Sequence, residues 1–170
     1  MKAETDWFPF SHTSPSILLS LGFRWYSRPL GGDIEWSRTW AAMDLRILIV
    51  DDSLSMRRII ATILGSHSGW RICGEAESGM SGIAMFQELN PDLVLLDFGM
   101  PDMNGIEAAS KMYTANPTVP LILFTVWDID GFEREAARAG ICAVVRKSEA
   151  WKLIAKIETV FAQRPIQRIQ

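Results

Sequence analysis

Five polar side chains stand in the sequence at points where a short apolar run ends. Apolar runs of this length, bounded by Gly, Pro or charged residues, are typical of strands that are buried on both faces. In an open parallel sheet the carboxyl ends of the strands open on one edge, and ligands bind there. The residues that would meet at that edge are Asp51, Asp52, Asp97, Thr125 and Lys147.

The three carboxylates of this set predict a metal site. Each close pair of carboxylates costs about 1–4 kcal/mol at the dielectric constant of a protein surface. A hard cation removes that cost, and carboxylate and backbone carbonyl oxygens are the ligands that Mg²⁺ prefers. Because Mg²⁺ keeps several waters and commonly binds phosphate as well, the site would have room for a phosphoryl group.

Asp97 is then a candidate nucleophile, because carboxylates can form aspartyl-phosphate intermediates. The metal and Lys147 would neutralise the equatorial oxygens of the transferring phosphoryl group, and Thr125 would donate a hydrogen bond to it. Taken singly, each residue is ordinary at a strand end, but their joint placement favours a functional site. Four other polar residues are interpreted as turn or structural residues: Asp92, Asp102, His12 and His67.

From Asp44 onward, apolar runs alternate with segments of helical period. Five such units predict a parallel sheet that is covered by helices on both faces, and right-handed crossovers would make it doubly wound. The run at 70–76 is the least apolar and is expected at the sheet edge. The expected strands are 45–50, 70–76, 93–96, 119–125 and 141–145; the expected helices begin at Ser53 and Ser148 or span 78–89, 104–115 and 128–139.

The first expected helix has apolar residues at a spacing that is typical of one buried face. Arg57 and Arg58 lie outside that face. Ser53 and Ser148 are expected to cap their helices, and Gly140 to end the fourth one. The residues assigned to the buried face are Met56, Ile59, Ile60, Ile63 and Leu64.

Composition excludes several classes of protein. The chain has 170 residues, 48% of them hydrophobic, and a net charge of -3. That is enough apolar material for a core, while the absence of a basic stripe argues against a nucleic-acid binder. No apolar run is long enough to cross a membrane. Cys73 and Cys142 show no metal or disulfide spacing, which favours a reduced, cytoplasmic protein.

Residues 1–42 differ from the rest, because they hold four of the seven tryptophans and show no sustained period. We expect them to be an unpacked extension, or a stretch upstream of a native start at Met43. An aromatic docking arm is the alternative. The folded domain is expected over 43–163, with a short tail at 164–170.

Residues 45–162 closely resemble the receiver domain of bacterial two-component response regulators. The resemblance implies a flavodoxin-like (βα)5 three-layer sandwich with strand order 2-1-3-4-5. Residues 100–107 and 147–149 look most like receivers that carry a helix-turn-helix output domain. The matching features are residues 47–50 before Asp51-Asp52, Leu95-Leu96-Asp97 with Met100-Pro101 and Asn104-Gly105, Thr125, and Lys147 before a helix.

The same resemblance implies the roles of the site residues. Asp97 would be the phosphoacceptor, and Asp51, Asp52 and Asp97 would hold Mg²⁺ together with the backbone carbonyl of Gly99. The two residues that match the family's phosphoryl-contacting pair are Thr125 and Lys147. The phosphoryl group would come from the histidine of a sensor kinase or phosphotransfer protein. Such a protein is a phosphoacceptor switch in phosphorelay signalling rather than an enzyme, and its output partner is unknown.

The chain departs from the family pattern in places. Only nine residues follow Phe161, so a stand-alone receiver that signals through changed protein contacts is expected, without direct binding to DNA. Val144 stands where many receivers have an aromatic switch residue, and Ser148 stands where many have proline. Trp127, two residues after Thr125, is expected to cover the site and to slow loss of the phosphoryl group.

Two rival functions remain at this stage. An aspartyl-nucleophile phosphatase of the haloacid-dehalogenase kind would need a second Asp two residues after the nucleophile, where this chain has Gly99. A phosphate-independent interaction module would not need the complete set of three carboxylates, a hydroxyl and an ammonium.

Overall fold

The computed structural model describes residues 44–127 and 131–163. Within them, five parallel strands form one sheet in the order β2-β1-β3-β4-β5, which confirms the expected flavodoxin-like topology. The less buried β2 lies at one edge, as its composition predicts. The strands are β1 (Leu45–Val50), β2 (Trp70–Ala76), β3 (Leu93–Leu96), β4 (Leu121–Thr125) and β5 (Ile141–Arg146).

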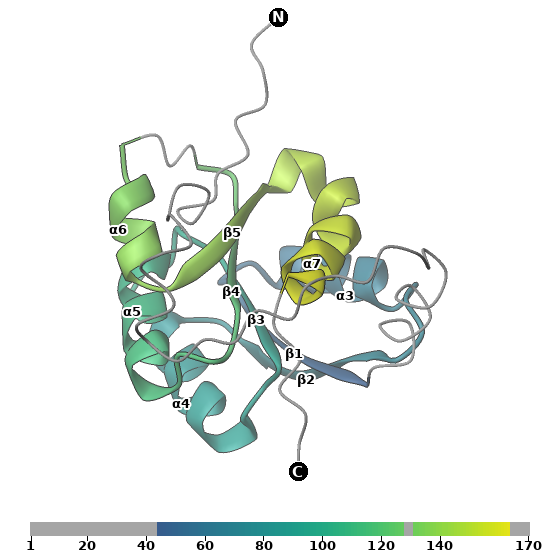
Figure 1. The fold of residues 1–170 in the computed structure, drawn as a ribbon, viewed down its shortest axis with the longest axis horizontal. Coiled ribbons are helices and arrows are strands. Elements are labelled where there is room, and N and C mark those ends of the chain that lie inside the picture. Colours follow the sequence, from purple (N-terminus) through teal and green to yellow (C-terminus); the bar gives the residue numbers. More distant parts are fainter. Residues whose placement is uncertain (1–43, 128–130, 164–170) are drawn as a thin grey trace, which may run out of the picture.

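Helices cover both faces of this sheet and make a three-layer sandwich (Figure 1). In that view α4, α5 and α6 lie on one side of the strands, and α3 and α7 on the other. Among the described residues, no helix has both the length and the apolar character needed to cross a membrane. The helices are α3 (Leu54–Leu64), α4 (Gly79–Leu89), α5 (Gly105–Ala115), α6 (Glu133–Arg138), the 3-10 helix η2 (Lys147–Lys152) and α7 (Leu153–Ala162).

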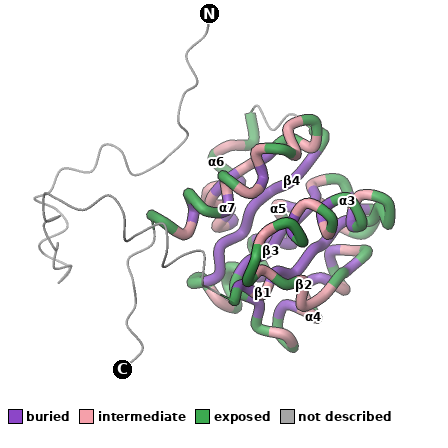
Figure 2. The backbone as a smooth tube through the Cα atoms, turned by 90° about the vertical axis from the view of Figure 1, so that its right-hand side faces the viewer, coloured by how far each residue is buried: buried purple, intermediate pink, exposed green. Residues whose placement is uncertain are grey.

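The core is divided in two by the sheet. Successive side chains of a strand point to opposite faces, so Leu48 and Val50 of β1 pack in the cluster under α4 and α5. Ile47 and Ile49 pack in the cluster under α3 and α7. The central strands β3 and β4 are buried along their whole length, between helices whose outer faces are exposed (Figure 2).

The buried face of α3 agrees with the expected one at Met56, Ile60, Ile63 and Leu64 but not at Ile59. Ile59 was assigned to the core but is 48% exposed, whereas Arg57, placed outside the core face, is only 9% exposed. The helix is turned so that Arg57, Ile60 and Leu64 face inward. Its first turn lies over the backbone of Asp51, where a carbonyl group accepts a hydrogen bond from the guanidinium. The burial of Arg57 is thus accompanied by a polar contact, which hydrophobic periodicity does not register.

Three expected boundaries were also wrong. Helix α6 begins at Glu133 and not at 128; residues 128–130 lie outside the described residues, and Gly131 has φ +95°, which is not helical. Strand β4 begins at Leu121, after a proline, rather than at 119. Ser148 does not cap the last helix, because it lies inside η2, and α7 has no side-chain cap.

Other local signals are confirmed. Ser53 caps α3, its hydroxyl accepting a hydrogen bond from the N–H of Met56 at 3.3 Å. Gly140 follows α6 with φ +81°, a left-handed conformation that favours glycine. These signals act within a few residues, which is why the sequence alone reveals them.

Candidate functional site

The two central carboxylates follow neighbouring strands. Asp51 comes directly after β1 and Asp97 directly after β3, and these strands pair in parallel. The N–H of Asp97 donates to the carbonyl of Val50 at 2.8 Å, so the strand pairing itself sets the position of Asp97 relative to the end of β1. The first turn of α5 packs against the backbone of Asp97 so closely that a Cβ at Gly105 would collide with its carbonyl.

Lys147 joins these two carboxylates. Its Nζ lies 2.7 Å from Oδ2 of Asp51 and 3.1 Å from Oδ1 of Asp97. Only 8% of the lysine side chain is exposed, and the two carboxylates are buried as well. Apart from this ammonium, Asp51 Oδ2 and Asp97 Oδ1 have no hydrogen-bond partner among the described residues. The site thus holds two buried anions that share one cation.

Asp52 completes an acidic cluster at this edge. One oxygen from each of Asp51, Asp52 and Asp97 lies within 4.8 Å of the others. Burial raises the pKa of Asp51, and the hydrogen bond from Lys147 opposes that rise only in part. A set of crowded carboxylate oxygens, with two buried atoms that face only an ammonium, fits a hard divalent cation such as Mg²⁺.

Thr125 ends β4 beside this cluster and is fully buried. Its Oγ1 accepts a hydrogen bond from the N–H of Trp127 at 3.2 Å. A hydroxyl that accepts here still has its own hydrogen to donate. The indole of Trp127 packs against Gly99, because a Cβ at Gly99 would lie 2.7 Å from Nε1 of the indole. The indole therefore lies against the backbone of Gly99, two residues after Asp97, although 57% of Trp127 is exposed.

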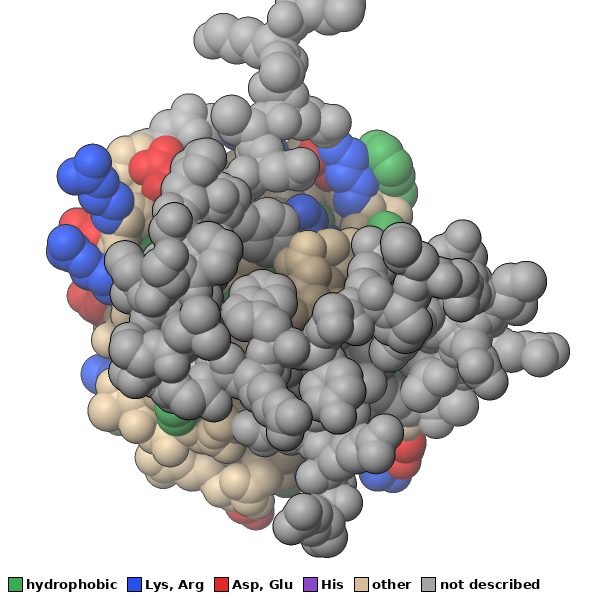
Figure 3. Space-filling view, in the orientation of Figure 1, with side chains coloured by type: hydrophobic (Ala, Val, Ile, Leu, Met, Phe, Trp, Pro, Cys, Tyr) green, Lys and Arg blue, Asp and Glu red, His purple; other side chains and the backbone are tan. Residues whose placement is uncertain are grey.

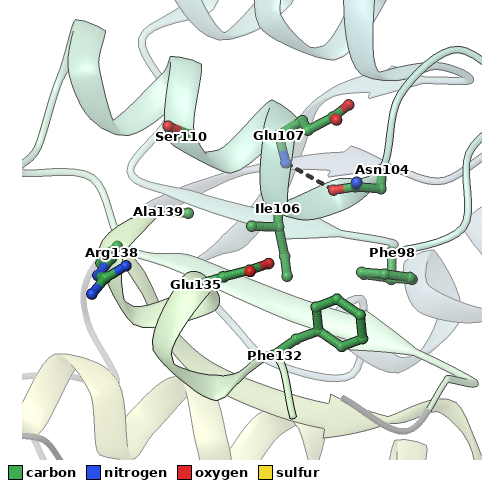
Figure 4. A pocket seen from close by; sticks show the side chains of 9 residues that line it. All are labelled: Phe98, Asn104, Ile106, Glu107, Ser110, Phe132, Glu135, Arg138 and Ala139. Atoms are coloured by element: carbon green, nitrogen blue, oxygen red, sulfur yellow. Dashed lines mark hydrogen bonds between the residues drawn. The ribbon is translucent and has the colours of Figure 1, made fainter. Parts of the chain in front are cut away.

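Phe98 links the site to a hollow between α5 and α6. Its ring lies 6.5 Å from that of Trp127 and 6.2 Å from that of Phe132. Phe98 and Phe132 line one end of a pocket of about 360 Å³, with Arg138 at the other end (Figure 4). An aromatic chain thus runs from the residue after Asp97 to the beginning of α6.

Val144 lies on β5, where it pairs in register with Leu123 and packs, half-buried, on the α5 side of the sheet. Val144 thus lies within β5, whereas Asp51, Asp97, Thr125 and Lys147 lie at the carboxyl ends of their strands. His67, expected to be structural, stacks on Trp70 with ring centroids 3.8 Å apart.

Sequence reasoning missed two polar residues that support this edge. Arg57 is described above, and Asp102 was interpreted as a turn residue. The carboxylate of Asp102 accepts hydrogen bonds from the N–H groups of Gly79 and Met80 at 3.0 and 2.8 Å, and these bonds lower its pKa. It therefore ties the loop after β3 to the beginning of α4. An arginine in the first turn of a helix was the one signal that pointed to Arg57, because local electrostatics disfavours it there.

Charged side chains are mixed on the visible surface. Along the edge over α5 and α6, basic and acidic groups alternate rather than gather by sign (Figure 3).

Comparison with known proteins gives the family. The model of the response regulator receiver domain matches residues 47–158. The response regulator GacA of Pseudomonas viridiflava is 32% identical over 119 residues, which cover 69% of this chain and 56% of GacA. The chemotaxis protein CheY of Thermotoga maritima is 35% identical over 98 residues, which cover 58% of this chain and 81% of CheY.

A solved structure agrees with these relatives. A two-component response regulator of the LuxR family from Aurantimonas superposes with a TM-score of 0.67 at 27% identity, over 71% of this chain and 86% of that one. The present chain spans little more than half the length of GacA. On the sequence match, the strand order and the set of residues at the sheet edge, the chain belongs to the response regulator receiver family of two-component phosphorelay signalling.

Proposed function

We propose that Asp97 accepts a phosphoryl group from the phosphohistidine of a sensor kinase or phosphotransfer protein. The observation that carries the proposal is the buried ion-pair set, in which Lys147 lies 3.1 Å from Asp97 and 2.7 Å from Asp51. In the transfer, an oxygen of Asp97 forms the new P–O bond. The P–N bond of the donor breaks, and the imidazole nitrogen keeps the electron pair.

The other residues of the edge have distinct roles in this proposal. Asp51, Asp52 and Asp97, with the carbonyl of Gly99, would hold Mg²⁺, which when bound neutralises charge on the phosphoryl oxygens. The ammonium of Lys147, which follows the edge strand β5, supplies a second positive charge at the same edge of the sheet. The hydroxyl of Thr125 donates a hydrogen bond to a phosphoryl oxygen, because its own hydrogen is not used in the bond from Trp127.

The protein so described is a switch. It holds a phosphoryl group and changes its contacts with other proteins, and its catalysis is limited to its own slow phosphorylation and dephosphorylation. The three carboxylates with Thr125 and Lys147 support this function over a phosphate-independent interaction module, which needs none of them. Gly99, two residues after Asp97, supports it over an aspartyl phosphatase.

Intact-mass measurement tests the proposal. With Mg²⁺ and acetyl phosphate, the wild-type chain should gain one phosphoryl group that hydroxylamine removes. Asp97→Asn should gain none, because the amide is not a nucleophile. Asp44→Asn, which changes an exposed carboxylate outside the site, should label like the wild type. Undiminished labelling of Asp97→Asn would place the phosphoacceptor elsewhere.

A further inference from the structure

Arg57 is a buried cation that lies behind the acidic cluster rather than in it. It is the fourth residue of α3 and is 9% exposed. Its Nη1 donates to the backbone carbonyl of Asp51 at 2.7 Å and makes a longer contact of 3.5 Å with the carbonyl of Asp52. Its Nε donates to Oε2 of Glu75, on β2, at 3.2 Å. One guanidinium thus ties the edge strand to the backbone of both acidic residues.

Local rules disfavour an arginine at this position. The first turn of a helix carries the positive end of the helix dipole, which favours acidic side chains there. The first turn of α3 has no acidic residue to offset the charge, and burial of a guanidinium is costly unless it is paired. The contacts that compensate all lie outside the helix, with Asp51, Asp52 and Glu75. Exceptions of this kind to local preference are expected at functional sites.

Metal ligands depend on such outer contacts. A carboxylate that binds Mg²⁺ must be held in position before the ion arrives, and residues behind the ligands supply that order. Asp51 and Asp52 are consecutive, so the orientation of the peptide group between them sets the direction of both side chains. We propose that Arg57 is a positioning residue that orients the acidic pair for Mg²⁺, with Glu75 holding the guanidinium. This inference rests on the proposed function, in which those acids bind the metal.

Whether substitution of Arg57 weakens or strengthens Mg²⁺ binding distinguishes a positioning role from a purely electrostatic one. A guanidinium near the site repels a divalent cation, so loss of the charge alone would strengthen Mg²⁺ binding. Loss of the hydrogen bonds to the carbonyls of Asp51 and Asp52 would weaken it, because the carboxylates would then have to be ordered on binding. The two effects oppose one another, and their balance can be measured without any phosphoryl donor.

Calorimetric titration with MgCl₂ in the absence of a phosphoryl donor provides the test. Arg57→Gln should weaken Mg²⁺ binding about 10–100-fold, as changes to the outer contacts of metal ligands do. Arg57→Lys, which keeps the charge and one donor group, should lose less of its Mg²⁺ affinity than Arg57→Gln does. Arg58→Gln removes the adjacent, exposed arginine and should bind Mg²⁺ as the wild type does. At saturating Mg²⁺, labelling of Arg57→Gln by acetyl phosphate should return close to the wild-type rate.

Several outcomes would overturn the inference. A folded Arg57→Gln protein, checked by circular dichroism, with equal or tighter Mg²⁺ binding would show that Arg57 does not position the acids. Should that variant not fold, Arg57→Lys and Glu75→Gln decide the matter, and wild-type Mg²⁺ affinity in both would refute it. Absence of labelling in the wild type would instead refute the proposed function, because the titration does not depend on phosphorylation.

Discussion

Lys147 and Asp51 form a buried ion pair across the carboxyl edge of the sheet, with Nζ 2.7 Å from Oδ2. The two residues follow β5 and β1, which are separated in the sheet by β3 and β4. The lysine therefore reaches over two strands, past Asp97, to the far carboxylate. Because the pair is buried, the charge of Asp51 is balanced by the protein itself, and a metal ion at this site has to share that carboxylate with the ammonium.

The first prediction concerns the cost of keeping Asp51 ionised. Burial raises its pKa, so folding disfavours the charged form. The stability that this group contributes is fully present below its unfolded pKa, about 3.9, and is lost as the pH rises through its folded pKa. In Mg²⁺-free buffer, Asp51→Asn should therefore be more stable than the wild type at neutral pH, and the difference should vanish in acid. Urea unfolding across this pH range measures it.

Asp44→Asn is the matched control for this experiment, because its carboxylate is 64% exposed and pairs with Arg71 at the surface. Its stability should follow the wild type at every pH. A loss of stability in Asp51→Asn at neutral pH would mean that the bond to Lys147 outweighs the burial of the charge.

The second prediction concerns Asp102, whose pKa is shifted in the opposite direction to that of Asp51. Hydrogen bonds from the N–H groups of Met80 and Gly79 lower the pKa of Asp102. Stability from this group is present above its unfolded pKa and is lost as the pH falls through its lower folded pKa. Asp102→Ala should unfold at a lower temperature than the wild type at neutral pH, and the gap should narrow below about pH 4. An equal difference in unfolding temperature at all pH values would mean that Asp102→Ala destabilises the protein by disturbing the packing of the loop instead.

The third prediction concerns the lifetime of the phosphoryl group. Hydrolysis needs a water in line with phosphorus, and the indole of Trp127 lies against Gly99 beside the site. We expect the indole to restrict that water, so Trp127→Ala should lose its label faster than the wild type. Trp151→Ala, which removes an indole that is 76% exposed on η2, is the control. An unchanged or slower rate in Trp127→Ala, followed by intact mass after removal of the donor, would contradict the role.

The sequence predicts the strands and the set of residues at the sheet edge because both follow from patterns that recur over short stretches, whereas the strand order was implied by the resemblance to receiver domains. Buried parallel strands read as continuous apolar runs, and a polar residue that ends such a run lies at the carboxyl edge. No knowledge of which helix faces which strand is needed. For the same reason Asp51, Asp97, Thr125 and Lys147 could be brought together before the structure was known.

What the sequence did not reveal depends on contacts between different elements of the fold. Arg57 is buried because a backbone carbonyl of Asp51 and the carboxylate of Glu75 surround it, 6 and 18 residues away along the chain. Asp102 caps a helix that begins 23 residues before it. Hydrophobic periodicity depends only on the polarity of these side chains, so it predicts that they lie at the surface. The 3-10 helix η2, which stands where the last helix was expected to begin, is a similar case, because a 3-10 turn leaves no clear signal in the sequence.

The fourth prediction concerns residues 1–42, which lie outside the described residues. If they do not pack on the domain, a chain that begins at Met43 should keep its thermal midpoint within about one or two degrees, less than loss of a 1 kcal/mol contact would cause. Differential scanning calorimetry of the two chains measures this. A clear fall in the midpoint would show that the tryptophans of this segment bury against the domain.

The last prediction concerns how phosphorylation changes the surface. A phosphoryl group shifts a conformational equilibrium only through contacts that differ between the two states. The hydroxyl of Thr125 offers such a contact, and Thr125 is followed by Trp127, whose ring meets Phe98 and, through it, Phe132 at the beginning of α6. On β5, Val144 has a β-branched side chain that is stiff at χ1 and too small for a large swing. We therefore expect activation to reshape the segment that follows Thr125 and to leave β5 nearly unchanged.

Hydrogen exchange with and without beryllofluoride, a mimic of the phosphoryl group, tests this expectation. Peptides over 125–131 should change their protection, and those over 142–146 should not. Thr125→Val, which keeps the size of the side chain and removes the hydroxyl, should abolish the change at 125–131, since nothing would then pull on the segment. Protection changes confined to 142–146 would mean that the signal leaves the site through β5, with Val144 moving after all.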